Sequence, residues 1–172
     1  MKLVHYIWSI ALSALLSCGE PSSEPPSTRL SPTESALQSD RTLECMKLGV
    51  ASMKQWLKDR RDEADEPIQE VQDRMLLAVS RHVETLPGPE RAAQAARLMQ
   101  FMDQQTNLGF DLYQSGSAGI RIAAHYAKLR GRLCQLMGNR PRAIAEYESC
   151  LDVLKLDDSQ ARLWRRQVEE NR

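Results

Sequence analysis

The sequence predicts an all-α protein, built as an antiparallel stack of about five or six helices and preceded by a signal peptide and a disordered linker. Apolar residues recur at spacings of three and four along most of the chain, which is the period of amphipathic helices rather than of strands. Prolines and glycines interrupt this pattern, as they do between helices. The length of 172 residues is that of a single domain once the N-terminal segments are set aside.

The first 17 residues have the order of a secretory signal peptide. Met1 and Lys2 form a short charged start, and Leu3–Leu16 is an apolar run without an acidic residue. A basic start followed by a short apolar region is typical of such signals. The run is shorter than the roughly 20 residues that a membrane-spanning helix needs. We therefore predict that residues 1–17 are a signal peptide.

The letters LLSCGE at residues 15–20 closely resemble the lipobox of bacterial lipoproteins. Leu15 stands three residues before Cys18, and Ser17 directly precedes the cysteine. The resemblance implies that the Cys18 sulfur receives a diacylglycerol, that the chain is cleaved before Cys18, and that the new α-amine is N-acylated. Apart from these covalent lipids, no cofactor is predicted. A signal peptide cleaved elsewhere, with Cys18 incidental, and an uncleaved anchor are the alternatives.

Residues 18–33 are predicted to be a lipidated tether. They are rich in Pro, Ser and Glu, a composition that stays extended and solvated and would hold a domain away from a membrane. Gly19 stands where lipoproteins kept in the inner membrane of enteric-type bacteria usually carry Asp. The resemblance therefore favours anchoring in the outer membrane, with the domain facing the periplasm.

Residues 34–172 are predicted to form one helical domain. The letters SPTE at residues 31–34 have the order of a capping box, with Pro where a first helical residue is tolerated. Three apolar stripes follow: Leu43, Met46, Val50, Met53 and Leu57, then Ile68, Val71, Met75, Val79 and Leu86, then Ala92, Ala95, Ala96, Met99 and Met102. Each stripe predicts one helix with a buried face.

Residues 106–119 are predicted to be the longest irregular stretch of the domain. They contain three glycines, and the helical pattern weakens over them. Long loops of this kind are often functional, although a simple connection or a broken helix gives the same pattern.

Residues 124–156 predict a helix, a tight turn at 138–141 and a second helix. This segment resembles one tetratricopeptide (TPR) repeat. Gly131 stands at the small position that lets the two helices approach, Ala143 at a position facing the first helix, and Tyr147 at the aromatic position of the second. The segment departs from the family pattern at Ala127, Arg130, Cys134 and Cys150 and lacks the closing Pro. No repeat of this period recurs elsewhere, so the resemblance implies one TPR-like hairpin.

A last helix is predicted over residues 160–171. Its apolar residues Leu163, Trp164 and Val168 are expected to seal the end of the helical stack, as a terminal element of a repeat array does.

The cysteines beyond Cys18 are Cys45, Cys134 and Cys150. An exported protein meets an oxidising compartment, where disulfides form. In a regular hairpin Cys134 and Cys150 would be offset by about six residues, or roughly 9 Å along the axis, whereas bridged Cα atoms usually lie within about 7 Å. Two possibilities stay open: a bridge from Cys45 to Cys134 or Cys150, or three buried thiols. No close pair of Cys or His predicts a metal site.

The sequence contains no motif of an enzyme. His82 and His125 stand alone on apolar helix faces, which favours structural roles over catalysis. Neither a serine nucleophile elbow, nor a His-Glu-x-x-His zinc motif, nor a glycine-rich phosphate loop is present. We therefore expect a protein without enzymatic activity.

A run of basic residues lies on the predicted hairpin. Between residues 121 and 142 there is no acid, and the cations are Arg121, Lys128, Arg130, Arg132, Arg140 and Arg142. Residues 18–120 carry a net charge of −5 and residues 121–172 one of +4, so the sum argues against a nucleic-acid binder. The run is either a basic groove for an acidic segment of a partner or for anionic lipid, or a helix balanced by the acidic half of its own domain.

These features favour a binding protein. We expect a lipid-anchored cell-envelope protein that acts as a protein–protein interaction or assembly module, since lipoproteins of this form resemble pilotins and assembly factors of secretion and pilus machines. The expected partners are another envelope protein and, through the anchor, the membrane. The alternative is a lipoprotein inhibitor or immunity protein against a periplasmic effector.

Overall fold

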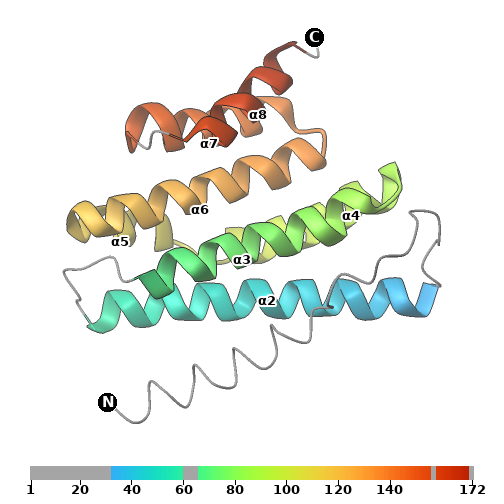
Figure 1. The fold of residues 1–172 in the computed structure, drawn as a ribbon, viewed down its shortest axis with the longest axis horizontal. Coiled ribbons are helices and arrows are strands. Elements are labelled where there is room, and N and C mark those ends of the chain that lie inside the picture. Colours follow the sequence, from blue (N-terminus) through green and yellow to red (C-terminus); the bar gives the residue numbers. More distant parts are fainter. Residues whose placement is uncertain (1–31, 60–65, 156–157, 171–172) are drawn as a thin grey trace.

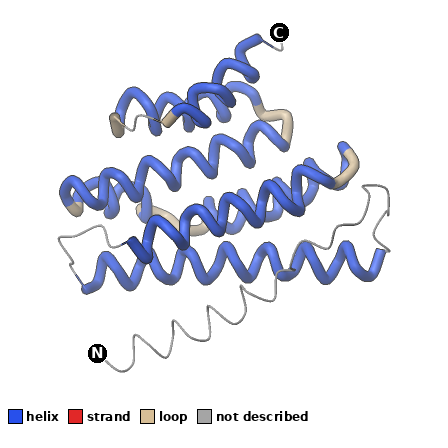
Figure 2. The backbone as a smooth tube through the Cα atoms, in the orientation of Figure 1, coloured by secondary structure: helices blue, strands red, loops and turns tan. Residues whose placement is uncertain are grey.

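The computed structural model describes residues 32–59, 66–155 and 158–170, and this part of the chain consists of helices joined by short connections (Figure 1; Figure 2). The elements are α2 (Pro32–Asp59), α3 (Glu66–His82), the 3-10 turn η1 (Val83–Thr85), α4 (Gly88–Asp103), α5 (Leu108–Gln114), α6 (Gly116–Leu136), α7 (Arg140–Glu148), the π-helical turn η2 (Ser149–Val153) and α8 (Ser159–Glu170). The described residues contain no strand, so the all-α prediction is confirmed.

The helices lie in successive layers around a core that the predicted stripes supply. Figure 1 shows α2 at one side, α3 and α4 next to it, then α6, and α7 with α8 at the opposite side. Helix α6 packs against α3, α4, α5, α7 and α8, which makes it the central element. Members of all three stripes are fully buried, among them Met46, Met53, Met75, Val79, Met99 and Met102.

The described residues hold seven α-helices, more than predicted, because residues 106–119 are largely helical rather than irregular. Leu108 and Leu112 are one helical turn apart and both buried, so α5 is held by its own apolar face. Gly116, with φ 87°, separates α5 from α6. At Gly119 a Cβ atom would lie 2.1 Å from the Leu112 carbonyl oxygen. Two of the glycines therefore serve a tight break and a close helix contact.

Helix α2 begins at Pro32, the proline that the capping-box order of residues 31–34 places at the first helical position. The predicted signal peptide, Cys18 and most of the predicted tether lie outside the described residues. None of the described helices is long and apolar enough to cross a membrane.

Helices α6 and α7 form the predicted hairpin. Gly138 has φ 76° in the turn, and the Asn139 side chain accepts a hydrogen bond from the backbone N–H of Arg142, which caps α7. A Cβ atom on Gly131 would lie 2.5 Å from the Tyr147 ring, so the expected close approach at this glycine is present. Tyr147 and Ala143 are fully buried.

Helix α8 covers the end of the stack with one face. Trp164 and Val168 are buried, and the Trp164 and Tyr147 ring centroids are 6.3 Å apart. Leu163 was predicted to join them but is 51% exposed. The reason is the helical period. Successive side chains on a helix are rotated by about 100°, so Leu163 points toward solvent while Trp164 points into the core.

Candidate functional site

The structure places the six predicted binding cations along α6 and α7. Five of them contact an oxygen atom within the domain: Lys128, Arg130, Arg132, Arg140 and Arg142. Arg121 lies near the start of α6 and is exposed. These contacts determine whether the basic run is a surface for a partner or part of the packing.

Lys128 forms a buried ion pair with Asp158. The Lys128 Nζ atom lies 2.6 Å from Asp158 Oδ2, and the two side chains are 8% and 12% exposed. Asp158 Oδ1 also accepts a hydrogen bond from the backbone N–H of Ala161, at 2.9 Å. Burial alone would raise the pKa of Asp158, but the hydrogen bonds from Lys128 and Ala161 outweigh it and lower that pKa. The pair therefore connects α6 to the first turn of α8.

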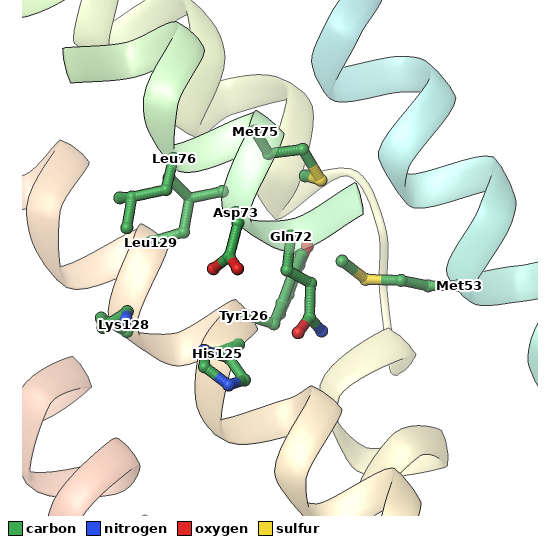
Figure 3. Close-up of a pocket in the computed structure, with 9 residues that line it drawn as sticks. All are labelled: Met53, Gln72, Asp73, Met75, Leu76, His125, Tyr126, Lys128 and Leu129. Atoms are coloured by element: carbon green, nitrogen blue, oxygen red, sulfur yellow. The ribbon is translucent and has the colours of Figure 1, made fainter. Parts of the chain in front are cut away.

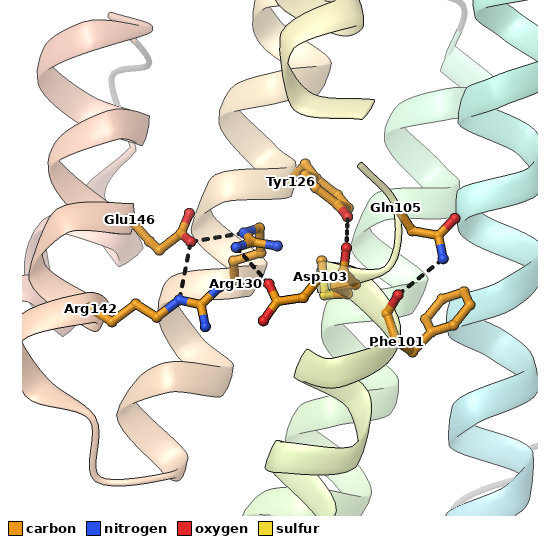
Figure 4. Close-up of polar contacts among 8 residues, drawn as sticks. Phe101, Asp103, Gln105, Tyr126, Arg130, Arg142 and Glu146 are labelled. Carbon is orange, nitrogen blue, oxygen red and sulfur yellow. Dashed lines mark hydrogen bonds and ion pairs between the residues drawn. The ribbon is translucent and has the colours of Figure 1, made fainter. Parts of the chain in front are cut away.

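Arg130 is the centre of a network that joins α4, α6 and α7 (Figure 4). Its guanidinium lies 2.8 Å from Glu146 Oε1 and 3.0 Å from Asp103 Oδ1. Arg142 donates to the same Asp103 oxygen at 2.6 Å. Burial raises the pKa of Asp103, but the hydrogen bond from Arg142 and the charge of Arg130 lower it overall. The Arg130 guanidinium also lies 5.9 Å from the Tyr126 ring centroid.

The remaining two engaged cations, Arg132 and Arg140, attach α8 and the η1 turn to the hairpin. Arg132 Nε lies 2.7 Å from Glu84 Oε1, and its guanidinium stands 4.7 Å from the Trp164 ring centroid. Arg140 donates to the Val168 carbonyl oxygen at 2.6 Å. Because these cations are already committed to intramolecular acceptors, the contacts favour the interpretation of a basic helix balanced by its own domain.

A second group of basic residues, which sequence reasoning missed, surrounds an open groove between η2 and α8. The groove has a volume of about 410 Å³ and is lined by Leu151, Asp152, Lys155, Arg162, Arg165, Arg166 and Glu169. We call it the η2–α8 groove. Lys155, Arg162 and Arg166 are exposed. Its four cations outnumber its two carboxylates.

Arg165 carries the internal ion pairs of the η2–α8 groove. Its guanidinium lies 3.0 Å from Asp152 Oδ2, 3.1 Å from Glu169 Oε1 and 3.4 Å from Glu148 Oε1. Both lining carboxylates are therefore engaged by this one residue. The sequence signal was weak here because acids alternate with the cations, unlike the acid-free run on α6 and α7.

The backbone of the groove wall is irregular. The Leu154 N–H bonds to the Ser149 carbonyl at 2.9 Å, the i to i+5 bond of a π-helical turn. Lys155 has φ 58°, which is uncommon for a residue with a side chain. These two features end the α7 segment and bring Asp152 and Lys155 to the groove that α8 completes. Such turns are frequent at functional sites.

Exposed aromatic residues lie elsewhere, on α5. Phe110 is 63% exposed, and Tyr113, three residues later and thus on the same helix face, is also exposed. Sequence reasoning named residues 106–119 as a candidate loop but did not single out this pair. It forms a surface distinct in chemistry from the η2–α8 groove.

The cysteines and histidines are packing residues. Cys45, Cys134 and Cys150 are buried and form no disulfide in the structure. Burial raises the pKa of Cys134 to about 11 and that of Cys150 to about 12, which keeps these thiols protonated and unreactive. His82 Nε2 lies 3.2 Å from Ser39 Oγ. Among the residues that the structure describes, no cluster of His, Cys, Asp and Glu is suited to a metal ion.

Comparison with other proteins adds no relative. No protein-family model matches the chain, no curated protein matches it, and no solved structure matches it.

Proposed function

We propose that this chain is a lipid-anchored cell-envelope protein whose helical domain acts as a protein–protein interaction or assembly module. The anchor rests on the resemblance of LLSCGE to a lipobox and on the Pro- and Ser-rich tract that follows Cys18. Two acyl chains on one residue suffice for stable membrane attachment. The lipid would insert into the outer membrane, and the domain would be held at the periplasmic surface of that membrane.

The observation that carries the interaction role is the η2–α8 groove. It is concave, its four cations outnumber the two carboxylates that line it, and Lys155 and Arg166 are exposed. Five of the six cations of α6 and α7, all but Arg121, contact oxygen atoms inside the domain. Charge complementarity guides encounter and specificity between proteins. The partner is therefore an acidic segment of another envelope protein, whose carboxylates the arginine forks bind.

The test uses the full-length chain in native membranes, with a photo-crosslinking residue at position 163, which is exposed on α8, or at position 110, which is exposed on α5. We expect position 163 to yield one discrete crosslinked envelope protein and to lose it in the Lys155→Glu, Arg166→Glu variant. The purified pair should associate more weakly as salt rises, because ionic contacts at an exposed surface are screened.

Two control arms separate the parts of the proposal. Cys18→Ser should abolish incorporation of a labelled lipid and leave the precursor uncleaved; normal processing would remove the anchor from the proposal. Crosslinking at position 110 alone would show that the partner does not bind at the η2–α8 groove. Crosslinking at position 163 that persists in the Lys155→Glu, Arg166→Glu variant would show the same. The captured protein itself distinguishes an assembly component from an effector enzyme that the chain inhibits.

A further inference from the structure

Gln72 occupies a core position of α3 that an apolar residue would ordinarily fill. It lies one helical turn after Ile68 and three residues before Met75, both buried, and is itself 6% exposed. Its Nε2 group donates to the Ile122 carbonyl of α6 at 3.2 Å. Within the described part of the chain, Gln72 Oε1 is the one buried side-chain polar atom without a hydrogen-bond partner.

The orientation of the Gln72 amide is fixed by Ile122. A carbonyl oxygen can only accept, so the amide atom that faces it must be the NH2 group. Turning the amide over would place two oxygen atoms against each other. The position of Oε1 therefore follows from chemistry and not from a choice between two similar atoms.

A small cavity of about 10 Å³ adjoins Gln72 between α3 and α6. Figure 3 shows Asp73 from α3 and His125 and Lys128 from α6 around the same space, with Met53 of α2 on another side. A polar cavity of about 10–15 Å³ holds one water molecule, and a site of this size excludes larger ligands.

We propose that this cavity binds one water molecule, which donates a hydrogen bond to Gln72 Oε1 and bonds to the ring of His125, bridging α3 and α6. A buried amide oxygen without a partner is costly, whereas a bridging water is nearly as good as a direct hydrogen bond. Together with the Gln72–Ile122 contact, the water would fix how α3 lies along α6. This site is independent of the proposed partner binding.

A crystal structure at about 1.5 Å resolution tests the proposal directly. We expect a water peak within hydrogen-bond distance of Gln72 Oε1, about 2.7–3.2 Å, and also near a His125 ring nitrogen. No peak in this space, or a peak beyond about 3.5 Å from Oε1, overturns the proposal.

Stability measurements on Gln72→Met, with Gln94→Met as matched control, provide a second test. Gln94 is also buried, and its Nε2 donates to the Ser39 carbonyl at 3.2 Å, so each variant loses one amide–carbonyl bond. If water occupies the site, Gln72→Met loses the bridge as well, and its Tm should fall about 2–4 °C further than that of the control. A fall in Tm equal to or smaller than that of Gln94→Met overturns the proposal. It would mean that Gln72 Oε1 had no water partner, because removing an unsatisfied oxygen offsets the loss of the bond to Ile122.

Discussion

The two basic regions of this domain differ in what their cations contact. On α6 and α7 four of the six cations pair with carboxylates that are far away in the sequence, as in the buried pair of Lys128 and Asp158. In the η2–α8 groove the carboxylates are nearby in the sequence, one residue engages them, and Lys155 and Arg166 remain exposed. A run of cations without local acids can therefore belong to the packing, whereas a run interleaved with acids can present charge to solvent.

Replacing one lysine from each region tests this difference with the largest expected effect. Lys128→Met leaves Asp158 buried without its ion-pair partner, so we expect the free energy of unfolding to fall by about 3–5 kcal/mol. Lys155→Met removes an exposed charge and should change it by less than about 0.5 kcal/mol. Urea denaturation followed by circular dichroism measures both. Similar losses in the two variants would contradict the division into packing and surface cations.

The close contact at Gly131 provides the next largest effect. Gly131→Ala places a methyl group about where the Tyr147 ring lies, at 2.5 Å, so α6 and α7 must move apart. Overpacking of this kind costs about 1–3 kcal/mol. It would also disturb the ion pairs that Arg130 makes across the hairpin. The control is Gly109→Ala on α5, where no atom lies within 4 Å, and there thermal unfolding should show no loss of stability.

The helical architecture was predictable because the helical period is a local property. The stripes through Met46, Met75 and Met99 proved to be buried faces, and the hairpin turn fell at Gly138. For residues 106–119 the sequence left a loop and a broken helix open, because glycine occurs in both, and the structure has a helix that breaks at Gly116. Gly119 instead allows a close contact with the Leu112 carbonyl, and such a contact depends on tertiary packing that no sequence window contains.

The roles of the polar residues were harder to predict, for a related reason. A charge count along the chain cannot show that Asp103, on α4, lies beside Arg130 and Arg142. Gln72 did carry a local signal, since it interrupts the apolar stripe of α3, but the missing partner of its oxygen is visible only in three dimensions. The η2–α8 groove depends on a π-helical turn and on the φ of Lys155, neither of which follows from composition.

Acidification gives the smallest effect and separates the two regions once more. Burial lowers the pKa of His82, and burial together with the charge of Lys128 lowers that of His125 against the opposing charges of Asp158 and Asp73. Below about pH 6.5 the unfolded chain therefore binds more protons than the folded one. The contribution of the two histidines to the free energy of unfolding should be fully present above that pH. It should decline below that pH by at most about 1.4 kcal/mol per pH unit for each histidine.

His82→Gln and His125→Gln should each flatten this decline, as measured by urea denaturation at a series of pH values. A decline of unchanged slope in both variants would show that other groups cause it. The residues that line the η2–α8 groove include no histidine, the side chain whose charge ordinarily changes in this pH range. Acidification to about pH 5.5 should therefore weaken the fold before it alters the groove, and a partner should stay bound there for as long as the domain remains folded.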